Sequence, residues 1–242
     1  MGAEALLYAA VMNNARWCDA VCRSHGYPGE FTGRLWSSLG HALPFYPNAI
    51  TLSPDVPAAE ATAGQDPSTP FAIKDSFARL DLAPEGLTPL FSAEWIALLP
   101  APDEPSAGDD LSWETVTDPG ELARWEAAWS SDGDGDVTGL FRPALLADPH
   151  CAVLACRRDG TLVGGATAYT TGGVTGISNV FKSGMAHGPL WAGVVRAVAK
   201  LRPGLPIVGY GHGEDLSAAR RAGFRVLGPL RVWARRPPVP PG

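Results

Sequence analysis

The sequence predicts a mixed α/β fold of the α+β kind, in which a mixed central sheet is flanked by helices. Three observations in the second half of the chain support this prediction. Asp159-Gly160 joins two segments rich in β-forming residues, which indicates a hairpin. Helical and strand-like patterns then alternate over residues 174–211 as strand, loop, helix and strand. Because a hairpin is antiparallel and such a crossover joins parallel strands, the sheet must contain both pairings.

The composition fits a globular chain of 242 residues, because 45% of them are hydrophobic. The net charge of −6 and the isoelectric point near 5.3 argue against a nucleic-acid-binding protein, which normally carries a basic face. No apolar run approaches the length of a membrane span, and the N-terminus lacks the basic region of a signal peptide. We therefore expect a cytoplasmic protein without nucleic-acid or membrane partners, whose four cysteines are reduced thiols.

The first hundred residues predict one helix and two short strands. Residues 4–25 carry apolar side chains at rough helical spacing, and residues 48–52 and 93–99 are short apolar runs typical of buried strands. Residues 100–110 combine prolines, acidic residues and low hydrophobicity, as linkers do. We therefore divide the chain into three parts, which are an N-terminal lobe (1–105), a second domain (106–236) and a Pro-rich tail (237–242).

The second domain opens with a strand at residues 111–116 and a helix with a recognisable start. Asp118 is the expected N-cap, since Pro119 occupies the first helical position and Glu121 lies three residues after the cap. This helix is expected to run to about residue 130. A second, shorter helix is predicted at residues 140–146.

The remaining elements alternate regularly to the end of the domain. The apolar patterns, glycines and prolines predict three strands (151–157, 161–170, 174–181), a glycine-containing loop (182–188), a helix opened by Pro189 (189–201), a strand (206–211), a short helix (215–222) and a closing strand (225–235). The domain is thus expected to run strand, two helices, three strands, helix, strand, helix and strand.

This order resembles that of the GNAT N-acetyltransferase superfamily. Two segments of the chain carry the resemblance: the strand, loop and helix of residues 174–201, and the segment 215–235, in which Gly223-Phe224 stands between a short helix and the last strand, as in the family's closing motif. The resemblance implies acyl transfer, with acetyl-CoA as co-substrate, to a small-molecule or peptide amine. Some members carry two related lobes, which suggests that the N-terminal lobe is a degenerate GNAT-like half. A homodimer is left open.

A helix that follows a glycine-containing loop is suited to binding the pyrophosphate of CoA. Its first N–H groups are unpaired and carry partial positive charge, and glycine lets a backbone approach closely. The loop departs from the family pattern Gln/Arg-x-x-Gly-x-Gly/Ala, because its two glycines have another spacing. The residues that the resemblance assigns to the cofactor are the strand end Asn179, Val180 and Phe181 and the loop residues Lys182, Gly184, Met185, Ala186, His187 and Gly188.

The groups expected to move protons also depart from the family. The family often places a tyrosine four residues before the glycine of Gly-Phe, and this chain has Ala219 there. Tyr210 and His212 stand nearby in the sequence and are the candidate catalytic residues. A backbone N–H near Val180 or Phe181 is the expected oxyanion donor. The altered loop and Ala219 favour the alternative, a non-catalytic module of the same fold that binds a ligand or serves as a scaffold.

No metal site is predicted. The segment 132–136 alternates Asp and Gly like the start of a calcium loop, but the glycine and glutamate required later in such a loop are replaced by Val137 and Pro143. Cys18 and Cys22 lack the second ligand pair that zinc requires. Motifs of serine hydrolases, P-loop proteins and Rossmann dinucleotide sites are absent.

Overall fold

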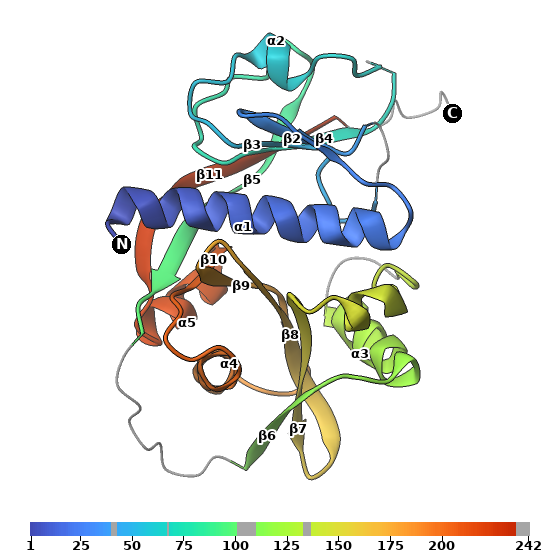
Figure 1. Ribbon diagram of the computed structural model, residues 1–242, viewed down its shortest axis with the longest axis vertical. Helices are drawn as coiled ribbons and strands as arrows, with labels where there is room; N and C mark the ends of the chain where they lie inside the picture. The colour runs from blue at the N-terminus through green and yellow to red at the C-terminus, as the bar shows by residue number, and fades with distance from the viewer. Residues whose placement is uncertain (40–42, 67, 101–109, 133–136, 236–242) are drawn as a thin grey trace.

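The computed structural model describes residues 1–39, 43–66, 68–100, 110–132 and 137–235. These residues form an 11-stranded mixed sheet in the order β1-β2-β3-β4-β11-β5-β10-β9-β8-β7-β6 (Figure 1). Its strands are β1 (Glu30–Phe31), β2 (Leu35–Ser37), β3 (Ala49–Thr51), β4 (Phe71–Asp75), β5 (Thr88–Leu98), β6 (Leu111–Thr115), β7 (Cys151–Arg158), β8 (Thr161–Thr171), β9 (Val174–Lys182), β10 (Ile207–Gly211) and β11 (Arg225–Arg235). The mixed α+β class predicted from the sequence is confirmed.

Helices cover both faces of the sheet. The helices are α1 (Ala3–Ser24), α2 (Ala58–Ala61), α3 (Pro119–Asp132), α4 (His187–Leu201) and α5 (Gly213–Arg221), together with the 3₁₀ helix η1 (Pro143–Ala147). The first helix, α1, crosses the middle of the sheet and packs with α3 in one apolar core, whereas α4 and α5 share a second core on the opposite face. A third cluster lies around β3 and β4. The strands between the first two cores are therefore buried on both sides.

Most elements predicted for the second half are present. Asp159 and Gly160 have φ values of 49° and 77°, as the two-residue turn of a right-twisted hairpin requires. The Asp118 carboxylate accepts a hydrogen bond from the Glu121 N–H at 2.9 Å, so it caps α3. Two predictions were wrong in detail. Residues 140–146 form no α-helix, because only the 3₁₀ segment η1 is present, and α4 begins at His187, two residues before Pro189.

The first hundred residues contain more structure than their sequence predicts. The helix predicted at 4–25 is confirmed as α1, and the strand predicted at 93–99 is the end of the longer β5. The segment between the two predicted strands holds α2 and β4, which were not predicted. In the sheet, β5 lies between β10 and β11, so strands from both predicted parts alternate. The linker at 100–110 and the tail at 237–242 lie almost wholly outside the described residues, and the boundary at 105 stays a prediction.

Candidate functional site

Strands β9 and β10 separate after a short stretch of parallel pairing. The pairing joins Thr175 to Ile207 and Gly176 to Val208 and goes no further, although β9 continues to Lys182. On its other side β10 pairs with β5 over all five of its residues. The second half of β9 is thus free of β10, and the sheet opens between them.

Strand β9 also contains a bulge at the point where it leaves β10. Ser178 pairs with Thr167 and Phe181 with Gly165 on β8, so Asn179 and Val180 together oppose one β8 residue. Asn179 has a φ of 52°, a left-handed conformation that asparagine tolerates better than most residues. A bulge of this kind interrupts the ladder of hydrogen bonds and leaves a residue of the bulged strand without a partner in that ladder.

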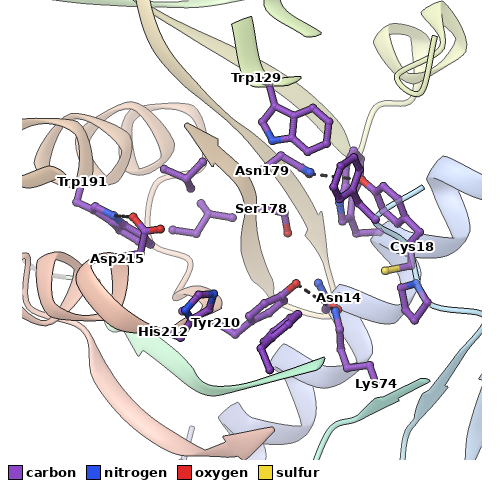
Figure 2. A pocket seen from close by; sticks show the side chains of 18 residues that line it. Asn14, Cys18, Lys74, Trp129, Ser178, Asn179, Trp191, Tyr210, His212 and Asp215 are labelled. Atoms are coloured by element: carbon purple, nitrogen blue, oxygen red, sulfur yellow. Dashed lines mark hydrogen bonds between the residues drawn. The ribbon is translucent and has the colours of Figure 1, made fainter. Parts of the chain in front are cut away.

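A cleft of about 320 Å³ occupies the opening and passes through the sheet. Its lining includes Trp17, Cys18 and Trp129 from the α1 and α3 side, and Trp191 and Asp215 from the α4 and α5 side. Figure 2 shows Trp191 and Asp215 at one end of the cleft and Cys18 beside α1 at the other. The absence of a side chain at Gly176 helps to bring α1 close, because a Cβ there would overlap the Asn13 side chain.

The structure brings four of the predicted site residues together at this cleft. Asn179 and Val180 lie at the bulge, and Tyr210 and His212 lie at the end of β10. Phe181 does not line it, because its ring is buried in the core and packs edge-on against Trp125 at 5.2 Å. None of the predicted loop residues lines this cleft, a set that comprises Lys182, Gly184, Met185, Ala186, His187 and Gly188.

The start of α4 keeps some features of an anion site and has lost others. Gly184 has a positive φ of 68°, and the N–H groups of His187 and Gly188 stand in the first turn, where no helical carbonyl pairs with them. Pro189 removes the next donor of that turn. His187 lies 3.5 Å from the Glu214 carboxylate and 3.6 Å from that of Asp215. Two acidic groups from α5 therefore face the positive end of α4.

Trp191 fills the interface between α4 and α5. The Trp191 ring is buried, packs edge-on against Phe224 at 5.7 Å and donates from Nε1 to Asp215 Oδ1 at 3.2 Å (Figure 2). This contact joins the two helices at the edge of the cleft. Met185, in contrast, packs toward Gly164 of β8 and away from the cleft.

Several cleft residues come from the N-terminal hundred residues, where no site was predicted. The most prominent is Lys74 of β4, whose ammonium donates to Asn14 Oδ1 at 2.6 Å and to the Tyr210 hydroxyl at 3.4 Å. The Tyr46 hydroxyl donates to Asn179 Oδ1 over a long 3.5 Å. Burial raises the pKa of the Cys18 thiol and raises that of the Tyr46 phenol well above its ordinary value, so both groups are neutral near pH 7.

Tyr210 and His212 differ in their surroundings. The Tyr210 ring packs edge-on against the buried Trp95 at 5.5 Å. Because Lys74 donates to the Tyr210 oxygen, the phenolic proton of Tyr210 is left to donate elsewhere. His212 is exposed, stands at the N-cap of α5 and lies 5.4 Å from the Phe91 ring. The cleft thus holds two groups that can exchange a proton, one at the end of β10 and one at the N-cap of α5.

The described part of the chain has neither a metal site nor a membrane-spanning helix. No three His, Cys, Asp or Glu residues among those described gather closely enough to hold a metal ion. The segment resembling a calcium loop, 132–136, falls outside the described side chains. Within the same described ranges, every helix is too short or too polar to cross a membrane.

Comparisons with known proteins establish the fold. No protein-family model matches the chain, and no curated protein matches it in sequence. A GCN5-related N-acetyltransferase from Kribbella flavida superimposes with a TM-score of 0.62 at 20% identity, over 97% of this chain and 96% of the other. A functionally unknown conserved protein from Staphylococcus epidermidis does so with 0.58 at 10% identity, over 85% and 92%.

A GCN5-related N-acetyltransferase from Sphaerobacter thermophilus gives a TM-score of 0.51 at 18% identity, over 70% of this chain and 61% of the other. At such identities a structural likeness concerns the fold, since one fold hosts many functions. The Kribbella protein nevertheless matches almost from end to end, N-terminal residues included. The chain therefore has the GNAT N-acetyltransferase fold.

Proposed function

We propose that this chain is an acyl-CoA-dependent N-acyltransferase that transfers an acetyl group from acetyl-CoA to an amine. The observation that supports the proposal best is the opening between β9 and β10 with a bulge at its edge. Such an opening offers two routes to one point: a thioester from the α4 and α5 side, and an amine from the α1 side. An extended pantetheine arm is able to pair with the free edge of β9, as an added strand does.

In this reaction the amine nitrogen forms a bond with the thioester carbonyl carbon, and the carbon–sulfur bond breaks. Negative charge develops on the carbonyl oxygen, and a backbone N–H at the Asn179–Val180 bulge is suited to stabilise it. The amine loses a proton and the departing thiolate gains one. Tyr210 and His212 are our candidates for these transfers, because both line the cleft and both side chains exchange protons.

The pyrophosphate of the donor would bind at the loop 182–186 and the first turn of α4. The N–H groups of His187 and Gly188 and the charge of Lys182 favour this anion. Glu214 and Asp215 oppose it, because they place negative charge beside the same helix start. We therefore expect these two carboxylates to weaken donor binding.

Calorimetric titration with acetyl-CoA tests the proposal. We expect saturable heat with the wild type. Binding should be about three- to tenfold weaker for Lys182→Gln, because a positive charge in the loop before α4 is lost. It should be unchanged for Lys200→Gln on the exposed side of α4. No heat at millimolar acetyl-CoA, or equal weakening by the two variants, would show that the proposed donor site is wrong.

A second function is favoured by one observation, the hydrogen bond between Trp191 and Asp215. Because this contact closes the interface between α4 and α5, the chain also fits a non-catalytic GNAT-fold module that binds a ligand in the cleft. The same titration separates the two candidates. If the chain is such a module, acetyl-CoA should give no binding heat, while another small molecule still binds in the cleft.

A further inference from the structure

A second cavity lies beside the cleft, among residues of β4, β5 and β11. The second cavity has a volume of about 360 Å³ and shares Tyr46, Lys74, Phe91 and Tyr210 with the cleft. Its remaining walls are mainly apolar and include Phe71, Leu90 and Val232. Lys74 lines both spaces, so its ammonium is available to a molecule bound across them.

The ammonium of Lys74 is buried without a counter-charge. The residue is 3% exposed, and no carboxylate of the described residues lies within 4.0 Å of its Nζ atom. Its partners are the Asn14 amide oxygen, the Tyr210 hydroxyl and the face of the Tyr210 ring, whose centroid is 4.4 Å away. Asp75 follows Lys74 in the sequence but accepts hydrogen bonds from the N–H groups of Phe77 and Leu80. Buried charges in proteins are normally paired, so this arrangement lacks an anion.

Two weakly acidic side chains that line the cleft with Lys74, Cys18 and Tyr46, do not supply this anion. Cys18 and Tyr46 remain protonated near pH 7, because burial raises the pKa of each. The second cation of the apolar cavity, Arg235, donates to the backbone carbonyls of Asp66 and Glu85 at 3.3 and 2.9 Å. Lys74 therefore offers one positive charge to the interior, which matches a monoanion better than a doubly charged group.

We infer that the chamber formed by the cleft and the second cavity binds a small molecule with a carboxylate at Lys74 and an apolar body against Leu90, Phe91 and Val232. Asn14 and Tyr210 hold the ammonium in place for the carboxylate (Figure 2). If the proposed function holds, this molecule is the acceptor, and its class is an apolar amine that carries a carboxylate. The assignment of this molecule as the acceptor rests on the proposed function, whereas the binding itself needs no acyl-CoA.

A set of three probes of one shape tests the inference. These are 3-phenylpropionate, 3-phenylpropanamide and 3-phenylpropylamine, which are negative, neutral and positive, and their binding to the full chain without acyl-CoA is measured by ligand-observed NMR and calorimetry. We expect the carboxylate to bind at least about tenfold more tightly than the amide, as hydrogen bonds to charged groups imply. The amine should bind most weakly. Equal affinities of the carboxylate and the amide would overturn the inference.

Lys74→Met and Lys200→Met provide the matched pair of variants. Lys74→Met keeps the length of the side chain and removes its charge, so it should abolish the preference for the carboxylate and retain binding of the amide. Lys200→Met, at an exposed position of α4, should leave both affinities unchanged. A carboxylate preference that survives in Lys74→Met would place the anion elsewhere and overturn the inference. A failure of acetyl-CoA binding in the earlier titration would leave these outcomes unaffected.

Discussion

The ammonium of Lys74 is held in the interior at a cost in stability. It lies among neutral partners and is 3% exposed, and an unpaired buried charge is unfavourable relative to an apolar side chain of similar size. We therefore expect Lys74→Met to raise the free energy of unfolding by roughly 1 kcal/mol in the absence of ligand. Lys200→Met should change it by less than about 0.5 kcal/mol, as exposed substitutions usually do. Urea denaturation followed by tryptophan fluorescence measures both, and a destabilised Lys74→Met would mean that the ammonium holds the fold together.

Single residues at the site were predictable only where a local pattern or the family resemblance pointed to them. Asn179, Val180, Tyr210 and His212 stand at the ends of strands with clear patterns, and all four line the cleft. Lys74 stands in a short strand of alternating apolar and small or charged residues. Such a pattern is typical of a strand with one face exposed to solvent, on which Lys74 would lie. It is buried because α1, which is remote in the sequence, supplies Asn14 on that face. Such a residue becomes visible only once the tertiary contacts are known.

At the scale of elements, the hydrogen bond between Trp191 and Asp215 joins α4 to α5 near the start of α4. We expect Asp215→Ala to tighten acetyl-CoA binding about three- to tenfold, because it frees Trp191 from its hydrogen bond and removes an anion beside the helix start. Glu214→Ala removes the same charge from an 86% exposed side chain that makes no contact with Trp191 in the described structure. Its effect should stay within about twofold, because exposed charges are screened. Calorimetry on both variants measures the difference, and equal effects would assign the change to charge alone.

Elements were predicted well where their signals are local. The hairpin at Asp159-Gly160 and the cap of α3 at Asp118 follow from two to four residues each, and both are present. The start of α4 was misplaced because proline was taken as the first helical residue, whereas it is tolerated throughout the first turn. Strand β4 was missed because its antiparallel partner is β11, whose residues lie more than 150 positions later. Pairing over such a distance leaves no local signal.

At the scale of the whole molecule, the sheet does not follow the order of the chain. Strand β11 pairs on one side with β4 and on the other with β5, both from the first 105 residues. Strand β10 pairs with β5 over five residues and with β9 over two. The buried Trp95 of β5 links the neighbouring segments, since its Nε1 donates to the Ser76 carbonyl at 2.8 Å and its ring packs on Tyr210 of β10. The cleft therefore depends on both predicted parts.

This dependence predicts how the two parts behave when they are separated. A chain of residues 106–242 loses both partners of β11 and exposes the apolar surface of β10, so it should show no cooperative unfolding transition on its own. Co-expression with residues 1–105 should restore a single transition and the near-ultraviolet circular dichroism of the intact chain, because β5 then takes its place between β10 and β11. The measurements are thermal melts and circular dichroism of each part, of the mixture and of the full chain. Cooperative unfolding of residues 106–242 alone would contradict this and would favour two independent domains, with the N-terminal part an addition to a complete acyltransferase-like domain. If neither part folds alone, the chamber around Lys74 belongs to the fold itself, and the N-terminal residues are required for any ligand that the cleft binds.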